Sequence, residues 1–497
     1  MKAAFLSTAF SILVIFFCLT PAAHGQVAFN TTNFNGPSIP VDIFVADMDQ
    51  DSFPDLLVAS GGAHTVTFFR NQRNGTFGNG TNLTTGGVGV NAVAADDIYS
   101  PGLPDIITAN CGNSPDAGST VIPSSVSVFR AVGEGFFNGA VNYNLPHCPN
   151  AMGTITVVNT TLRSVIVSDG TSTITLLKND GSGHLTAQSV SGPSGSQFFG
   201  ISAADYDGDG PEDIAAVMRV SGQPDQVVVF FQNWDGSFFG PVSVFSMSGV
   251  RLLAANTVDL NNDGAADLLV PFENGASGPA GVVALTNDTT GNFQPVTLNV
   301  DNAYNDIGHK AAEGDLDGSG FHSIVLPVAV LGPGAFFTAY AVFPQSGQGN
   351  WLDPIYVNAD SWGGHGTAEA AALGDFNRDG QLDISGADGE DNQVFVFTNA
   401  TTTQTCAVPQ GQGGVNICSP ANGGVSGSPA RIAAAANGGI NPISGMIAYI
   451  DDQQVASSDS FTLNAVVSDS PGTHTLVVNA WDIFGNLFQS TVTFQSQ

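Results

Sequence analysis

The chain has 497 residues, of which 43 are acidic and 11 basic, and its formal net charge is −32. Only six of the acidic residues are Glu, 37 are Asp, and only three of the basic residues are Lys. Helical surfaces normally carry Glu and Lys, whereas Asp prefers turns, so the composition excludes a mainly helical protein. The 60 Gly and 26 Pro indicate short strands joined by tight turns. The negative charge excludes a nucleic-acid partner and disfavours binding to anionic membranes.

The first 25 residues predict a signal peptide. Lys2 gives a short positive region, residues 3–19 are apolar, and Ala23 and Gly25 stand at the −3 and −1 positions of a cleavage site before Gln26. The alternative is a membrane anchor, because the apolar stretch nearly reaches the spanning length of about 20 residues. The small-residue site favours cleavage, so we expect a secreted, periplasmic or cell-surface protein without membrane insertion after cleavage.

Four cysteines remain in the mature chain. An even number in an exported protein suggests disulfides. Proximity in the sequence favours Cys111 with Cys148 and Cys406 with Cys418 over the two other pairings.

An aspartate-rich phrase recurs along the chain. Aspartate or asparagine stands at positions 1, 3 and 5, glycine usually at 6, and aspartate at 9, over residues 47–55, 205–213, 259–267 and 375–383. An altered copy at 315–323 has serine at positions 5 and 9. Neighbouring copies start about 50 to 60 residues apart. The longer gap after the first copy has room for two more units. One is a depleted copy at 97–105, and in the other, near 159–165, we expect the loop to be lost. Seven repeats are therefore predicted.

The surroundings of each copy predict four strands per repeat. An alanine-rich strand precedes the loop, an apolar strand follows it, and a third strand alternates apolar and polar residues before a turn that often ends in Gly-x-Phe. A fourth, weaker strand completes the unit. This pattern predicts an all-β fold, a seven-bladed β-propeller over residues 26–400. Residues 27–41 can add the outer strand of the last blade and close the ring.

The strand, Asp loop and strand units resemble FG-GAP repeats of the VCBS type, which occur in secreted bacterial proteins and, with similar calcium loops, in integrin α subunits. The resemblance covers residues 27–400. Ser52 in the first loop, the depleted second and third units, and Ser319 and Ser323 in the sixth loop depart from it. It implies that the calcium loops share one face of the ring and that a ligand binds on the opposite face.

The loops offer the oxygen ligands that a calcium ion prefers, including the backbone carbonyl at position 7. The alternative is that these aspartates only form turns. Repetition favours about four to five structural calcium ions, whose binding energy would stabilise the fold. The predicted ligands are Asp47, Asp49, Asp51, Phe53 and Asp55 in the first loop; Asp205, Asp207, Asp209, Pro211 and Asp213 in the fourth; Asp259, Asn261, Asp263, Ala265 and Asp267 in the fifth; Asp315, Asp317, Ser319 and Phe321 in the sixth; and Asp375, Asn377, Asp379, Gln381 and Asp383 in the seventh.

The C-terminal part differs in composition. Residues 401–418 form a Thr- and Gly-rich linker that the Cys406–Cys418 pair would tie into a loop. Residues 419–497 show several short strands with turn signals, which predict a small β-sandwich. Its segment 472–485 is similar to the last strands of bacterial immunoglobulin-like (Ig-like) domains, which more often serve as spacers or adhesive modules.

No GxSxG, HExxH or phosphate-binding motif is present in the sequence. Residues that precede the innermost strands should gather at the channel mouth away from calcium, where they could bind a sugar or peptide. The alternative is that they are ordinary loop residues. These candidate ligand-binding residues are Phe198, Phe199, Tyr304, Trp362, His365 and Glu369.

The sequence therefore predicts an exported, calcium-binding, non-enzymatic protein that recognises an extracellular protein or glycan. The main alternative is a carbohydrate-active enzyme, a polysaccharide lyase or hydrolase, with its site at the channel mouth. A third is a structural subunit that uses its second and third blades as a partner surface.

Overall fold

The computed structural model describes residues 29–496 apart from 114–121, 275–277, 302–303, 319, 333–334, 346, 360–367, 401–405, 407, 410–412, 427–429, 440, 459–460 and 468–471. The predicted signal peptide lies outside the described residues, as do Ser319, Trp362 and His365. The described residues form strands and turns and contain no helix. None of them forms an apolar helix long enough to cross a membrane.

The described strands up to Asn399 form seven sheets of four or five strands, which we number 1 to 7 along the chain. Sheet 1 contains β2 (Pro40–Ala46), β3 (Asp55–Ser60), β4 (Thr65–Phe69) and β5 (Thr81–Thr84); sheet 2 contains β6 (Val90–Asp96), β7 (Asp105–Asn110), β8 (Ser125–Phe129) and β11 (Val141–Asn144); sheet 3 contains β12 (Ala151–Ile155), β13 (Ser164–Ser168), β14 (Thr173–Asn179) and β15 (Leu185–Ser191); and sheet 4 contains β16 (Ser196–Ala204), β17 (Asp213–Val220), β18 (Asp225–Gln232) and β19 (Phe238–Met247).

The remaining three sheets follow the same antiparallel order, with the first strand interrupted in sheets 5 and 6. A two-stranded ribbon, β9 (Ala131–Gly133) with β10 (Phe136–Phe137), follows β8 of sheet 2, and its Phe137 packs on Phe68 of sheet 1 with ring centroids 5.8 Å apart. Sheet 5 contains β20 (Arg251–Leu252), β21 (Asn256–Val258), β22 (Asp267–Glu273), β23 (Gly281–Asn287) and β24 (Phe293–Asn299); sheet 6 contains β25 (Tyr304–Ile307), β26 (Ala312–Gly314), β27 (Ser323–Gly332), β28 (Ala335–Phe343) and β29 (Ile355–Asn358); and sheet 7 contains β30 (Ala368–Gly374), β31 (Asp383–Asp388), β32 (Gln393–Asn399) and β1 (Phe29–Asn35).

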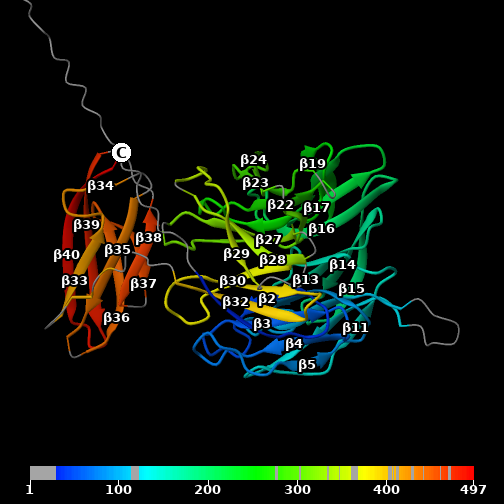
Figure 1. Ribbon diagram of the computed structural model, residues 1–497, viewed down its shortest axis with the longest axis horizontal. Helices are drawn as coiled ribbons and strands as arrows, with labels where there is room; N and C mark the ends of the chain where they lie inside the picture. The colour runs from blue at the N-terminus through cyan, green and yellow to red at the C-terminus, as the bar shows by residue number, and fades with distance from the viewer. Residues whose placement is uncertain are drawn as a thin grey trace, which may run out of the picture.

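These sheets form a closed ring. The first strand of each sheet contacts the next sheet, and β30 of sheet 7 contacts β2 of sheet 1 (Figure 1). As predicted, the N-terminal strand β1 completes the last sheet: it pairs antiparallel with β32, from Phe29 opposite Asn399 to Asn35 opposite Gln393. The ring is therefore held closed by strand pairing between the two ends of the sequence.

Burial within a sheet follows from its position in the ring. In sheet 1 every residue of β3 and β4 is buried, whereas β5 is mostly exposed. The middle strands pack against neighbouring sheets on both faces, so they are largely apolar, and the fourth strand lies at the rim. The hydrophobic cores lie between adjacent sheets, such as the core that Ile166 of sheet 3 and Ile214 of sheet 4 share.

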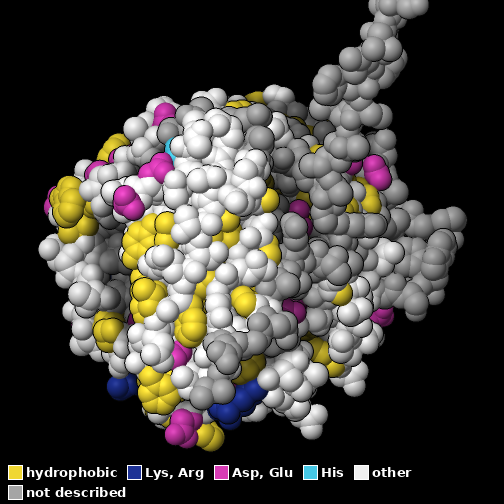
Figure 2. All heavy atoms as spheres, turned by 90° about the vertical axis from the view of Figure 1, so that its left-hand side faces the viewer, with side chains coloured by type: hydrophobic (Ala, Val, Ile, Leu, Met, Phe, Trp, Pro, Cys, Tyr) yellow, Lys and Arg dark blue, Asp and Glu magenta, His cyan; other side chains and the backbone are white. Residues whose placement is uncertain are grey.

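The strands after Asn399 form a separate pair of sheets that encloses its own core. Side chains of both sheets meet there, including Ile432 and Leu463 from one and Met446, Leu476 and Phe494 from the other. Figure 2 looks at the molecule from this side and shows scattered acidic side chains, with basic ones only at the lower edge. One sheet contains β33 (Gly414–Ser419), β35 (Ala430–Asn437) and β38 (Thr462–Val467), and the other contains β34 (Val425–Ser426), β40 (Leu487–Ser496), β39 (Gly472–Asp482), β36 (Ile443–Ile450) and β37 (Gln453–Ser458).

Two disulfides join the predicted cysteine pairs. Cys111 is bonded to Cys148 within sheet 2 and its following loop, and Cys406 is bonded to Cys418 at the start of the C-terminal sheets.

Candidate metal loops and central cavity

The connection between the first and second strands, which we call the Asp loop, has the same length in all seven ring sheets. Its first residue organises the turn. The Asp47 carboxylate accepts hydrogen bonds from the backbone nitrogens of Asp51 (3.0 Å) and Ser52 (2.7 Å). Ser52 adopts a left-handed conformation with φ 72°, which a glycine at position 6 provides in every other loop except the third. The serine in the first loop therefore leaves the turn intact.

Four further loops repeat this contact with glycine as the donor. The donor and acceptor pairs are Gly210 with Asp205, Gly264 with Asp259, Gly320 with Asp315, and Gly380 with Asp375.

The aspartate at position 9 is buried and holds the two ends of the loop together. The Asp55 carboxylate accepts hydrogen bonds from the Met48 nitrogen (3.0 Å) and from the nitrogen of Asn71, two residues after the third strand (2.8 Å). Burial raises the pKa of Asp55 to about 7. The equivalent Asp213 has a pKa of about 7 for the same reason, and those of Asp267 and Asp383 are about 6. A bound cation would favour the ionised form of these groups.

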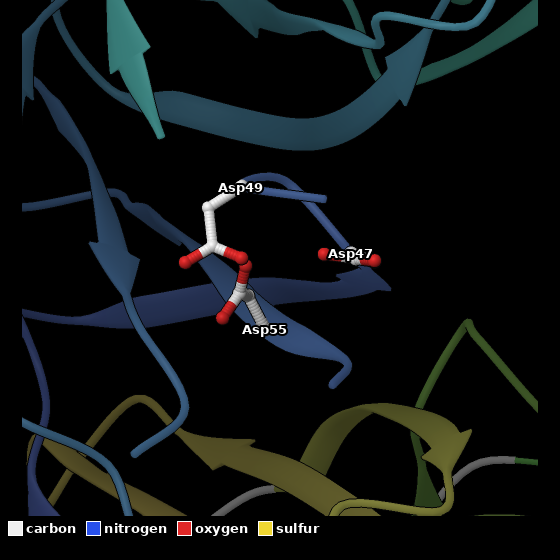
Figure 3. Close-up of side chains that lie close together, drawn as sticks. All are labelled: Asp47, Asp49 and Asp55. Atoms are coloured by element: carbon white, nitrogen blue, oxygen red, sulfur yellow. The ribbon is translucent and has the colours of Figure 1, made fainter. Parts of the chain in front are cut away.

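Three carboxylates converge in the first loop. Ligand oxygens of Asp47, Asp49 and Asp55 lie within 4.8 Å of one another, and Figure 3 shows Asp49 and Asp55 turned toward each other. Arg70 also contacts Asp49, and the Arg73 Nε lies 2.8 Å from the Asp51 carboxylate. Two guanidinium groups therefore already balance part of the charge in this loop.

The fourth loop brings Asp205, Asp207 and Asp209 together within the same distance. Within the described part of the chain these three side chains form no ion pair. Burial, followed by the charge of Asp207, raises the pKa of Asp209. Three like charges at one turn, held by backbone hydrogen bonds, fit a divalent cation that takes oxygen ligands at 2.3–2.6 Å.

The fifth and seventh loops have asparagine at position 3. The Asn261 amide donates to Asp263 at 2.8 Å, and the Asn377 amide donates to Asp379 at 3.0 Å. In both loops the side chains at positions 3 and 5 therefore lie next to each other, as they must if both are to bind the same ion.

The sixth loop differs. His322 contacts Glu313 and lies 3.0 Å from the Asn262 side chain. It is therefore largely covered, although its place in the loop suggests a solvent-facing side chain. Asp317 is buried, and Ser319 lies outside the described residues.

The second loop lacks oxygen ligands of the motif at positions 3 and 5, where Tyr99 and Pro101 stand, and the third loop lacks all its aspartates, but both keep the turn. In the second, Asp97 still accepts from the Gly102 nitrogen (2.6 Å), and Asp105 accepts from Tyr99 and Ala131.

The expectation that the third unit has lost its loop altogether is wrong, because residues 156–163 form a connection as long as the others. The sequence pattern failed there because only the side chains that mark the motif are missing.

In the third unit an arginine links three sheets. The Arg163 Nε lies 2.9 Å from Asp96 of sheet 2, and its Nη1 lies 2.6 Å from Glu212 of the fourth loop. The third loop has no aspartates of its own, and the positive charge of Arg163 lies there between carboxylates of the two neighbouring sheets.

A buried side-chain amide connects neighbouring ring sheets, a feature that the sequence patterns missed. In sheet 5 the Asn287 amide donates to the Tyr206 carbonyl of the fourth loop (2.8 Å) and to the Ala266 carbonyl of its own loop (3.1 Å). Such a residue, which we call the amide bridge, stands at the end of the third strand or two residues after it in sheets 1, 3, 4, 5 and 7. The amide bridges are Asn71, Asn179, Gln232, Asn287 and Asn399. In sheet 6 Gln345 takes the same place and donates to the His322 carbonyl of its own loop (2.8 Å). Their recurrence at strand ends was the signal that could have revealed them.

A cavity of about 490 Å³ lies at the centre of the ring, lined by first strands of sheets 1 to 5 and by residues 309–311. Lys310 Nζ contacts the Asp42 carboxylate (2.9 Å) and the Ile43 carbonyl (2.7 Å). His309 lies 3.6 Å from Glu369. The cavity therefore combines paired charges with small apolar residues.

The candidate ligand-binding residues divide into three groups. Phe198 is 0% exposed and packs in the core between sheets 3 and 4, so its predicted ligand contact is wrong. Phe199 lines the central cavity, with the Arg219 guanidinium 4.0 Å from its ring centroid. Glu369 pairs with His309 beside the cavity. Tyr304 begins β25, its side chain lies outside the described atoms, and Trp362 and His365 lie outside the described residues.

Comparison with known proteins identifies one repeat. Residues 164–216 match the model of the FG-GAP-like repeat family, a segment that runs from β13 through the fourth Asp loop into β17. A search of the curated proteins finds no match.

Solved structures with a similar arrangement include two extracellular domains. Those of BT4673 and BT3049 from B. thetaiotaomicron, both described as hybrid two component systems, are 11% and 10% identical, with TM-scores of 0.41 and 0.40. The alignments cover 95% and 93% of this chain but only 60% and 55% of those chains. The Dos1 propeller is 10% identical over 75% of this chain and 95% of its own, with a TM-score of 0.39.

The segment that matches the repeat family contains one of the Asp loops that recur around the ring of sheets. The chain therefore contains an FG-GAP-like repeat within an all-β, propeller-type ring of sheets.

Proposed function

We propose that the chain is an exported, calcium-stabilised, seven-bladed β-propeller with an Ig-like C-terminal domain, and that it acts in extracellular recognition or adhesion without catalysis. The fourth Asp loop carries the calcium assignment, because Asp205, Asp207 and Asp209 converge there without a countercharge among the described residues. Calcium would supply that charge and fix the turn. Two disulfides support an oxidising, extracytoplasmic location.

A calcium titration of the chelator-treated protein by calorimetry, with elemental analysis, tests the calcium assignment. We expect about four to five ions per chain and a melting temperature that falls in chelator, because one ion at 100 times its Kd contributes about 2.7 kcal/mol. A protein without calcium, whose melt is the same in chelator, would contradict it.

The Asp207→Asn variant tests the fourth loop. It removes one of three converging carboxylates, so we expect one fewer ion or a clearly weaker site. Asp353→Asn, an exposed residue outside the Asp loops, is the matched control and should bind calcium like the parent protein.

A second candidate function is that of a carbohydrate-active enzyme. His309 and Glu369 form an acid and base pair, and His309 lines the central cavity, which favours this candidate. An activity screen on polysaccharides decides between the two. Turnover that Glu369→Gln abolishes would establish catalysis, whereas binding without turnover favours recognition.

A further inference from the structure

A recess separate from the central cavity lies between the Asp loops of sheets 3 and 4. Its volume is about 430 Å³, within the roughly 300–1,000 Å³ that is usual for small-molecule sites. Residues of both loops and one aromatic side chain line it. They include Val158, Asn159, Thr160, Pro211, Glu212 and Trp234.

Trp234 is exposed although it is large and apolar. The residue is 68% exposed, and a Cβ on Gly210 would lie 3.5 Å from its ring, in van der Waals contact. Because Gly210 has no side chain, this position leaves that part of the ring uncovered. An exposed indole beside a polar recess is available to stack on a flat ligand surface.

The turn that carries Trp234 is fixed by its own hydrogen bonds. The Asp235 carboxylate accepts from the Ser237 nitrogen (2.9 Å) and hydroxyl (2.6 Å), and the Gly236 nitrogen donates to the Asn233 carbonyl (2.7 Å). The turn therefore loses little conformational entropy when a ligand stacks on this ring.

The opposite wall is fixed as well. The amide bridge Gln232 accepts from the Val158 nitrogen (2.8 Å) and donates to the Thr156 carbonyl (3.1 Å). Glu212 is held by the Arg163 guanidinium (2.6 Å) and by the Thr156 nitrogen (2.8 Å). Its carboxylate is thus a positioned hydrogen-bond acceptor that shares the Arg163 guanidinium with Asp96.

We propose that this recess binds one sugar ring of a glycan. The apolar C–H face of a pyranose would stack on Trp234, and its hydroxyls would bond to Asn159, Thr160 and Glu212. A purely apolar ligand would leave these polar groups unpaired, which costs free energy. An anionic ligand would be repelled there, because Asp96 and Glu212 share the single Arg163 guanidinium. This inference rests on the proposed recognition function and adds to it a site and a class of ligand.

The test is binding of the full chain, in calcium, to an array of immobilised glycans, followed by titration of a bound glycan against the indole fluorescence. We expect Trp234→Ala to weaken binding about tenfold or more, as removal of a central aromatic anchor does, and Trp234→Phe to keep part of it. Phe484→Ala, an exposed aromatic of the C-terminal sheets, is the control and should bind like the parent. Melting curves of all variants should coincide, because both side chains are exposed.

Three results would overturn the proposal: a parent chain that binds no glycan, glycan binding that Trp234→Ala leaves unchanged, or capture of a peptide rather than a glycan at this residue. If glycan binding is lost in His309→Ala but kept in Trp234→Ala, the central cavity is the site. In that case the recess proposal fails while the proposed recognition function stands.

Discussion

At the scale of single residues, the position 9 aspartate and the amide bridge both make hydrogen bonds to backbone groups at the end of an Asp loop. Asp267 accepts from the Asn287 nitrogen at 2.6 Å, and the Asn287 side chain donates to two carbonyls on different sheets. Asp105 keeps its backbone contacts in a loop that lacks aspartate or asparagine at positions 3 and 5. The turn therefore forms without the full set of oxygen ligands.

We predict that Asn287→Ala destabilises the ring by about 1–3 kcal/mol, because it leaves the carbonyls of Tyr206 and Ala266 buried without their donor. Denaturant unfolding measures this change. Asn74→Ala, whose side chain bonds only to exposed Thr76 among its described contacts, is the control and should change stability by less than about 0.5 kcal/mol. Equal effects of the two substitutions would show that the amide bridge is not a stabilising contact.

Asp482 in the C-terminal sheets gives a prediction about pH. Its carboxylate accepts hydrogen bonds from the Asn486 side chain (2.7 Å), the Asn441 side chain (2.9 Å) and the Phe484 nitrogen (2.9 Å). These contacts, that of the Asn486 side chain foremost, lower its pKa to about 2. A folded-state pKa below the unfolded value of about 3.9 stabilises the fold above that pH, and this contribution is lost as pH falls toward 2.

Melting curves between pH 7 and pH 2 check this. Asp482→Asn should be less stable than the parent at pH 7, because the NH₂ group of the new amide faces N–H groups that now donate to the carboxylate. The difference in stability should shrink toward pH 2. Asp452→Asn, on an exposed turn of the same sheets, is the control. A difference that stays constant over the whole range would contradict the assignment.

At the scale of elements, the Asp loops and the strands beside them could be predicted because both repeat. Burial on both faces makes the second strands largely apolar, third strands such as β4 and β8 alternate small polar and apolar residues, and the turn needs the same residue types each time. Phe198 and Phe199 could not be separated in this way. Adjacent residues of a strand point to opposite faces, so Phe198 enters the core while Phe199 reaches the cavity. A register shift between Phe199 and Ile201 hides this from the sequence pattern.

Differences between the loops predict different calcium affinities. In the first loop Arg70 and Arg73 contact Asp49 and Asp51, and positive charge beside a site weakens cation binding. We predict that Arg70→Gln together with Arg73→Gln strengthens calcium binding at this loop. Calorimetric titration should show a tighter or an additional site. Arg251→Gln, whose side chain is exposed beside Glu273 in sheet 5, is the control, and unchanged titration of the double variant would contradict the prediction.

At the scale of the whole molecule, stability depends on one strand that joins the ends of the ring. β1 covers the edge of β32, which would otherwise offer unpaired backbone groups to other chains. Its Phe34 also packs on Phe69 of sheet 1, with ring centroids 5.1 Å apart. The closure therefore couples sheet 7 to sheet 1 through both pairing and packing.

The paired positions Asn30 and Thr398 allow this closure to be locked. Opposite residues of an antiparallel pair have Cα atoms about 4.5–5.5 Å apart, which is within the range for a disulfide. We predict that Asn30→Cys with Thr398→Cys forms a disulfide on oxidation and stabilises the ring by about 2–4 kcal/mol, because it closes a long loop. Thiol titration and denaturant unfolding, oxidised against reduced, measure both effects. Asn30→Cys with Val396→Cys is out of register by two residues and should not cross-link; equal cross-linking of both pairs would show that the strand does not hold this register.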